Sequence, residues 1–294
     1  MPLYSYLCTV THHGNQTYLA PDGICDFLFY DSVYKIKEGT LSEGISKLRP
    51  SAQYFIKQAS KYNKTQFGLS FGTETVFTPS MFISIAHITF TMAYSKDCRI
   101  FPVSMASLPT GLKRGKDYDG HTVNESLAVL RKVVKMGLAI PTAISFTFKG
   151  LYYLPKFADD YSPKVEEFML FKKCAYFDPP FYGDPKALCG KPDWTPVLPE
   201  LAYSLSLKRT ITYLTGARIA TLACDAKQFY LDLTFNLAGY DVGYDHAAPC
   251  EELGFNTQRS SYGRVVMMRE LMNFLRTNYT KPTDNFVCIR TFAA

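Results

Sequence analysis

The chain of 294 residues is 47% hydrophobic, 20% charged and 15% aromatic, a balance that excludes an intrinsically disordered protein. Its formal net charge of +6 is spread along the sequence, and the densest basic stretch, residues 113–116, is followed at once by Asp117 and Asp119. A nucleic-acid partner is therefore not expected. The length suits one large core, so we predict a single domain over residues 1–294.

Strands and amphipathic helices alternate through the first half of the sequence. The predicted strands lie at residues 3–10, 25–34, 66–71, 99–105 and 143–148. The predicted helices lie at residues 51–62, 78–92 and 122–137. A proline-rich, loop-rich insertion at residues 151–200 interrupts this alternation. The alternation then resumes with strands at residues 201–207, 210–214 and 237–244 and helices at residues 217–233 and 264–277.

The cysteines form an even set without a close C-x-x-C pair, which favours disulfides over a zinc site. Four sequons for N-glycosylation agree with passage through a secretory route. No apolar run is long enough to span a bilayer, and the first residues lack the regions of a signal peptide. We therefore expect a mature or trimmed extracellular chain. The cysteines are Cys8, Cys25, Cys98, Cys174, Cys189, Cys224, Cys250 and Cys288, and the sequon asparagines are Asn15, Asn63, Asn124 and Asn278.

Residues 210–250 read as strand, helix and strand, the parallel crossover unit of α/β sheets and barrels. The last strand continues as DVGYDH at residues 241–246 and leads to a cysteine. This segment resembles the end of the barrel in glycoside hydrolase family 18, the chitinase family, which carries Asp-x-Asp-Asp-Phe there. Only the first acidic position of that motif, Asp241, is kept. Ala238 stands where active members have a tryptophan that floors the sugar site.

The resemblance implies an α/β fold of the (β/α)8 type, a TIM barrel, with a small α+β insertion held by disulfides. Residues 72–142 are too few for two complete strand–helix units, so we expect one unit to be shortened or lost. Residues 168–174 resemble the aromatic helix that ends in a cysteine in the family's α+β domain. Residues 21–35, PDGICDFLFYDSVYK, also resemble secreted tick and mite proteins that are built on a degenerate chitinase frame.

The catalytic motif of family 18 is absent from this sequence. Hydrolysis there depends on Asp-x-x-Asp-x-Asp-x-Glu after the fourth strand, because the glutamic acid protonates the glycosidic oxygen and the neighbouring aspartate positions the acetamido group. No such spacing occurs in this chain, and the predicted strand at residues 99–105 carries no acid. The family's Tyr-Gly-Arg is also lost, because Lys149-Gly150-Leu151 stands at its position.

Two carboxylate pairs are the remaining acidic candidates, Asp241 with Asp245 and Asp117 with Asp119. A catalytic pair needs an environment that raises the pKa of one member. Without a visible partner of that kind, we interpret the first pair as a strand-end salt bridge and the second as a turn.

The histidines offer one candidate of interest. His12 and His13 read as an exposed loop pair, and His87 as a structural residue on a helix. His246 follows Asp245 at the carboxyl end of the last strand, where barrel enzymes bind their ligands. No Gly-x-Ser-x-Gly, His-Glu-x-x-His or phosphate-binding loop is present.

We therefore predict a secreted, catalytically inactive chitinase-like protein that binds an extracellular protein or glycan partner. The alternative is a weak or divergent glycoside hydrolase that acts on sugars containing N-acetylglucosamine. No cofactor, metal or membrane span is predicted, and the oligomeric state is left open. The candidate ligand-binding residues are Tyr152, Tyr153, Trp194, Tyr213, Asp241, Tyr244, Asp245 and His246. Each tyrosine could instead pack the core, and Trp194 could instead plug the insertion against the barrel.

The resemblance also implies disulfide pairings. The family joins its first two strands at the positions of Cys8 and Cys25, and links the insertion at Cys174 to Cys250 beyond the last strand. The remaining cysteines would pair as Cys189 with Cys224 and Cys98 with Cys288.

Overall fold

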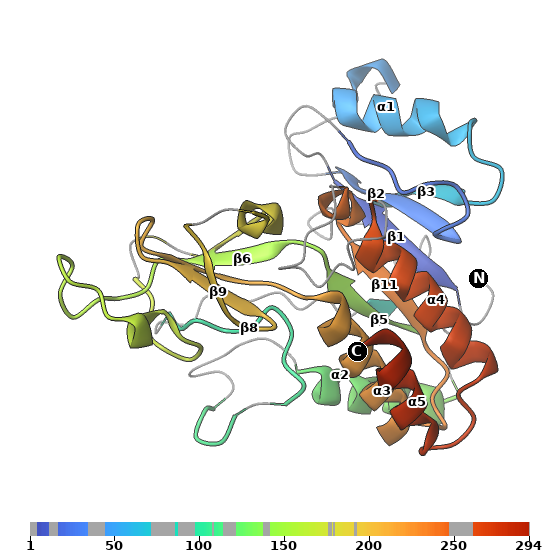
Figure 1. Cartoon of the computed structure of the whole chain (residues 1–294). Coiled ribbons are helices and arrows are strands. Elements are labelled where there is room, and N and C mark those ends of the chain that lie inside the picture. Colours follow the sequence, from blue (N-terminus) through green and yellow to red (C-terminus); the bar gives the residue numbers. More distant parts are fainter. Residues whose placement is uncertain are drawn as a thin grey trace.

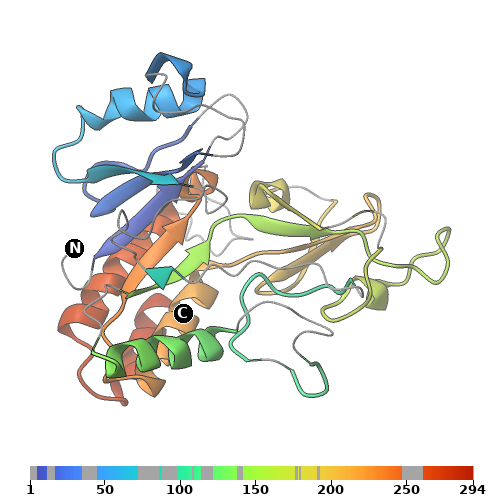
Figure 2. The same ribbon diagram turned by 180° about the vertical axis from the view of Figure 1, so that it is seen from behind.

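The computed structural model describes residues 5–11, 17–34, 45–71, 86–87, 98–107, 109–113, 122–137, 142–175, 178, 180–190, 193–246 and 261–293. These residues form a parallel sheet covered by helices and a separate antiparallel sheet that projects to one side (Figure 1). The view from behind shows the same separation (Figure 2).

The parallel sheet has six strands in the order β3-β2-β1-β11-β5-β4. Each neighbouring pair is parallel, and Leu7 of β1 faces Phe27 of β2 on one side and Ala238 of β11 on the other. The strands are β1 (Tyr6–Val10), β2 (Phe27–Tyr34), β3 (Gln66–Phe71), β4 (Ala86–His87), β5 (Thr142–Thr147) and β11 (Asn236–Tyr240). All five side chains of β1 are buried, as expected of a central strand covered on both faces.

The predicted closed (β/α)8 barrel is wrong. The first and last parallel strands do pair, as in a barrel, but β3 and β4 remain the two edges of an open sheet within the described residues. The physical reason lies in the predicted strand at residues 99–105. Its backbone pairs with the insertion instead of the sheet, because Ile100 N–H donates to Lys172 O at 2.9 Å and Phe171 N–H donates to Ile100 O at 2.7 Å.

The predicted helix at residues 78–92 also differs from the structure. Ala86 and His87 form strand β4, which pairs with β5 at Thr142 and Ala143. The rest of that predicted helix lies outside the described residues. The β-branched and aromatic residues around this stretch suit a strand as well as a helix, so periodicity alone does not decide between them.

The described residues form five α-helices around the parallel sheet. Helix α1 (Pro50–Ala59) packs on β2 and β3, whereas α4 (Gly263–Thr277) packs on β1 and β11. Helix α3 (Gly216–Phe229) contacts α2 (Val123–Lys135), α4 and α5 (Asp284–Phe292). Thr122 and Glu125 form a capping box at the start of α2, and Thr215 caps α3. None of the described helices is long and apolar enough to cross a membrane.

The antiparallel sheet has five strands in the order β7-β6-β10-β9-β8. They are β6 (Gly150–Tyr153), β7 (Phe181–Gly183), β8 (Thr195–Leu198), β9 (Leu201–Ser204) and β10 (Arg209–Thr212), with the short 3-10 helices η4 (Val165–Phe168) and η5 (Pro185–Leu188) between them. The insertion therefore continues beyond residue 200. The predicted aromatic helix at residues 168–174 is not formed, because the chain turns after η4 and Lys173 bridges to Arg99.

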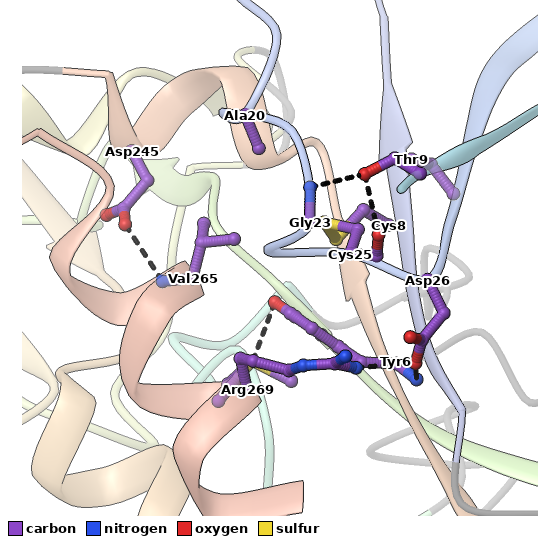
Figure 3. Close-up of a disulfide and its surroundings, with 12 residues drawn as sticks. Tyr6, Cys8, Thr9, Ala20, Gly23, Cys25, Asp26, Asp245, Val265 and Arg269 are labelled. Carbon is purple, nitrogen blue, oxygen red and sulfur yellow. Dashed lines mark hydrogen bonds and ion pairs between the residues drawn. A yellow bond between two sulfur atoms is a disulfide. The ribbon is translucent and has the colours of Figure 1, made fainter. Parts of the chain in front are cut away.

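The Cys8–Cys25 disulfide confirms one predicted pairing and links β1 to the loop before β2 (Figure 3). Beside it, Asp26 accepts the backbone N–H of Tyr6 at 2.8 Å and pairs with Arg269 of α4 at 2.5 Å. The buried Tyr6 hydroxyl reaches Met268 Sδ at 3.7 Å. These contacts hold β1 and the segment before β2 against α4.

The other predicted pairings that the structure tests are wrong. Cys174 pairs with Cys98 instead of Cys250, and Cys224 pairs with Cys288 instead of Cys189. The Cys98–Cys174 bond links residues 98–101 to the insertion, and the Cys224–Cys288 bond joins α3 to α5. The resemblance implied a different partner for Cys98 because it placed residues 99–105 in a barrel strand. Cys189 is also disulfide-bonded.

Candidate functional site

Polar side chains gather where three adjacent strands of the parallel sheet end. Thr11 follows β1, Asp241 follows β11 and Lys149 follows β5. The Asp241 carboxylate accepts a hydrogen bond from the Thr11 hydroxyl at 2.8 Å and forms an ion pair with Lys149 Nζ at 2.9 Å. Its backbone N–H donates to Thr9 Oγ1 at 3.1 Å. These contacts confirm the interpretation of Asp241 as a strand-end salt bridge.

The backbone of Asp241 explains why β11 ends there. Its φ of 58° and ψ of 45° are left-handed, a conformation that Asp tolerates better than most residues other than glycine. The chain then turns through the 3-10 helix η6 (Val242–Asp245) instead of continuing the strand predicted up to residue 244. This turn places the Tyr244 ring 5.3 Å from Lys149 Nζ.

Two tyrosines beside Asp241 keep their protons. Burial raises the pKa of Tyr240, and the charges of Asp31 and Asp241 raise it further. Burial is also the largest influence on Tyr244 and raises its pKa, although the Lys149 ammonium opposes this effect. At neutral pH both side chains therefore remain neutral hydroxyls, which suits them to donate hydrogen bonds and not to act as bases.

A second polar cluster lies where the insertion meets the end of β11. Lys186 of η5 donates to the backbone oxygen of His246 at 2.5 Å and lies 3.8 Å from Asp184 Oδ2. The His246 ring stacks on Tyr18 with a centroid distance of 4.2 Å and an interplanar angle of 9°. Lys186 Nζ is 5.8 Å from the Tyr18 ring. We call Asp241, Lys149, Tyr244, Lys186 and His246 the carboxyl-edge cluster.

Asp245 has a structural role. Its side chain and that of Arg264 are both 0% exposed and are joined by an ion pair of 2.8 Å. The second carboxylate oxygen accepts the Val265 backbone N–H at 3.1 Å, at the start of α4. Figure 3 shows this contact between η6 and α4. Arg264 also donates to Leu214 O after β10 and to Phe148 O after β5. Its guanidinium therefore joins α4 to η6 and to these two segments.

The predicted aromatic rim does not form an open surface. Tyr153 and Tyr213 are 0% and 1% exposed, and Tyr152 and Trp194 are each 8% exposed. Trp194 packs edge-on against Tyr152 at a centroid distance of 5.9 Å, inside the core of the insertion. The burial supports the packing role that the alternative interpretation gives to Trp194, but the ring packs within the insertion and not between the insertion and a barrel. Of the predicted aromatic side chains, Tyr244 and His246 are the partly exposed ones.

The remaining predicted residues are scattered. Asn63, Asn124 and Asn278 lie at exposed positions, which leaves these three sequons accessible. Asn15, His12, His13, Asp117 and Asp119 lie outside the described residues, as does Cys250. In the part of the chain that the structure describes, no three His, Cys, Asp or Glu side chains gather in a group that could hold a metal ion.

The sequence does not predict the lysines and the threonine hydroxyl of this site. Lys149 is only a departure from the family pattern, and no motif marks Thr11, Tyr18 or Lys186. One signal was available for Lys149, because it follows a predicted buried strand and therefore lies at the carboxyl edge of the sheet. Lys186 lies within the proline-rich insertion, where no periodicity predicts which side chains point toward the sheet.

Comparison with family models and with curated proteins finds no match for this chain. The resemblance to the chitinase family thus remains a prediction from the sequence.

Proposed function

We propose that this protein is a non-catalytic, extracellular binding protein that holds a protein or glycan partner at the carboxyl-edge cluster. One observation carries the proposal. The two carboxylates after β11 already have partners, because Asp241 contacts Lys149 and Thr11 and Asp245 of η6 pairs with Arg264. A glycosidase instead needs one carboxyl group that can deliver a proton and a second one poised across the scissile bond.

The position of the cluster supports a binding role. In open α/β sheets, ligands bind outside the carboxyl ends of the strands. Here the insertion stands beside that edge, and Lys186 and His246 connect the two parts. Tyr244 and His246 offer partly exposed rings, and Lys149 and Lys186 offer polar groups next to them. The disulfides fit an oxidising compartment, which agrees with an extracellular site of action.

The test is a glycan array run beside affinity capture from extracellular fluid. Wild type, Tyr244→Ala and a matched control, Tyr161→Ala, would be compared. Tyr161 lies in the insertion and is 100% exposed, so its loss should change neither folding nor binding. We expect Tyr244→Ala to lose the partner that wild type and the control retain. Its melting temperature should fall because the ring packs against the main core, so binding is measured at a temperature where the variant is still folded. Equal binding by all three proteins would contradict a role for the carboxyl edge.

A turnover assay tests the alternative of a weak glycosidase. We expect no hydrolysis of N-acetylglucosamine oligomers above background between acidic and neutral pH, because loss of proton transfer alone costs about 10²–10⁴-fold. Turnover that disappears in Asp241→Asn, but persists in the Tyr161→Ala control, would show that the site is catalytic.

A further inference from the structure

Exposed lysines lie on α1 and on the chain immediately before and after it. Residues 45–64 contain five basic residues and no Asp or Glu. Lys47, Tyr54, Lys57, Lys61 and Lys64 are all exposed. We call these five residues the lysine stripe. In Figures 1 and 2, α1 stands at one extremity of the molecule, apart from the insertion.

Only part of the lysine stripe lies on the helix. Lys57 follows Tyr54 by three residues within α1, so these two side chains are neighbours on its surface. Lys61 lies in the turn after α1, where its backbone N–H donates to Gln58 O at 2.9 Å, and Lys47 lies in the 3-10 helix η2 (Ile45–Lys47) before α1. The opposite face of α1 is buried through Ala52 and Phe55.

The ends of the lysine stripe are held in place. The Gln53 amide donates to the backbone oxygens of Ser46 and Leu48 at 3.2 and 2.7 Å, which ties the turn containing Lys47 to α1. At the other end, the Asp22 carboxylate accepts the backbone N–H of Lys64 at 3.0 Å. A stripe with a fixed backbone loses less conformational freedom when it binds a partner.

The ammonium groups of the stripe form no ion pair with the acidic side chains that the structure describes. Among the described residues, none of Lys47, Lys57, Lys61 and Lys64 forms an ion pair, whereas lysines of the carboxyl-edge cluster do. Asp22 meets the backbone of Lys64, and no ion pair joins it to the Lys64 ammonium within the described residues. The stripe is thus a local row of positive charge around one exposed aromatic ring.

We propose that the lysine stripe is a second binding surface, for an acidic, sulfated polysaccharide. A linear polymer with repeated sulfates matches a row of cations, and ammonium groups bind such anions as point charges. Tyr54 supplies a ring on which a sugar can stack. An anionic membrane fits less well, because the apolar face of α1 is already buried and leaves little to insert. Nucleic acid fits less well because the disulfides indicate an oxidising compartment.

The experiment measures binding of the full, disulfide-bonded chain to immobilised heparin. Lys57→Glu/Lys61→Glu is compared with Lys132→Glu/Lys135→Glu, a control of equal charge change at exposed positions in the last turn of α2. We expect the stripe variant to bind roughly tenfold more weakly, because two exposed charge contacts become repulsive, and the control to change by less than about twofold. Tyr54→Ala should weaken binding without altering its salt dependence.

The same measurement separates the stripe from the proposed function. Tyr244→Ala should leave heparin binding unchanged. The proposal for the lysine stripe and the proposal for the carboxyl-edge cluster can therefore be refuted independently of each other. Equal losses in both charge variants would overturn the proposal, since net charge would then explain binding. Stronger binding to duplex DNA, or to vesicles of phosphatidylcholine and phosphatidylserine, would assign the stripe to that class of partner instead. Lys57→Ala/Lys61→Ala provides a neutral version that keeps the helix intact.

Discussion

Replacing Arg264 with Met should lower the free energy of unfolding by about 3–5 kcal/mol, because it leaves the buried Asp245 carboxylate without its cation. The upper part of that range is expected here. Arg264 also donates to Leu214 O at 2.7 Å and to Phe148 O at 3.3 Å, and a buried acceptor left without a donor adds about 1 kcal/mol or more.

Substituting Asp245, the partner of Arg264, should lower the free energy of unfolding by a similar amount, because it leaves the arginine without its counter-charge. Asp245→Asn keeps an oxygen that can accept the Val265 N–H, but it leaves a buried guanidinium without a counter-charge, again about 3–5 kcal/mol. The double variant Arg264→Met/Asp245→Asn buries no lone charge. We therefore expect the double variant to lose about as much stability as either single variant, which corresponds to a coupling energy of about 3–5 kcal/mol between the two residues.

Urea unfolding under non-reducing conditions, followed by far-ultraviolet circular dichroism, measures these differences. Arg131→Met is the control, because the Arg131–Asp232 pair is exposed and should contribute less than about 1 kcal/mol. If the single losses add in the double variant to within about 0.5 kcal/mol, the two charges are not coupled and the reasoning fails.

Three further predictions concern the insertion, a loop and a disulfide. Trp194→Ala should cost about 3–5 kcal/mol in urea unfolding, because the ring is buried; a stable variant would contradict its packing role. The backbone N–H of Asn63, chief among three such donors, lowers the pKa of Asp22 below its ordinary 3.8. Ionised Asp22 therefore stabilises the folded protein above that pH. The melting temperature of wild type should exceed that of Asp22→Asn at neutral pH, and this difference should shrink as the pH falls below 3.8. A difference that does not change with pH would refute this prediction. Cys224→Ala/Cys288→Ala should lower the free energy of unfolding by about 4 kcal/mol, because the bond closes a loop with a sequence separation of 64. Urea unfolding measures this loss. A loss near zero would mean that other contacts hold α5 in place.

Local signals in the sequence predicted most of the individual elements. The aromatic run of β2, the proline and apolar spacing of α1 and the apolar spacing of α3 are each local signals, and the structure confirms all three elements. Closure of the sheet is a different kind of property. It depends on whether a strand-like stretch such as residues 99–105 finds a partner in the sheet or in the insertion, and that competition is between segments far apart in the chain.

The aromatic rim failed as a prediction for a related reason. In β6, Leu151 and Tyr153 face the main core, while Tyr152 faces the smaller core around Trp194. Both faces of the strand are covered, so alternation in the sequence cannot identify an exposed side. The salt bridge of Asp241 was predicted from its place near the end of the last strand, but its left-handed backbone and its partner Lys149, which follows a different strand, were not.

The pairing of β1 with β11 has a consequence for how the chain acquires its fold. Ser5 N–H donates to Asn236 Oδ1 across a sequence separation of 231, and both strands lie in the middle of the sheet, not at its edges. During synthesis, the centre of the sheet therefore cannot form until β11, near the end of the chain, has been made. The Cys8–Cys25 bond closes a short loop and needs only the first residues, so it can hold β1 beside β2 until then. We expect ribosome-bound chains that end before β11 to stay sensitive to proteases.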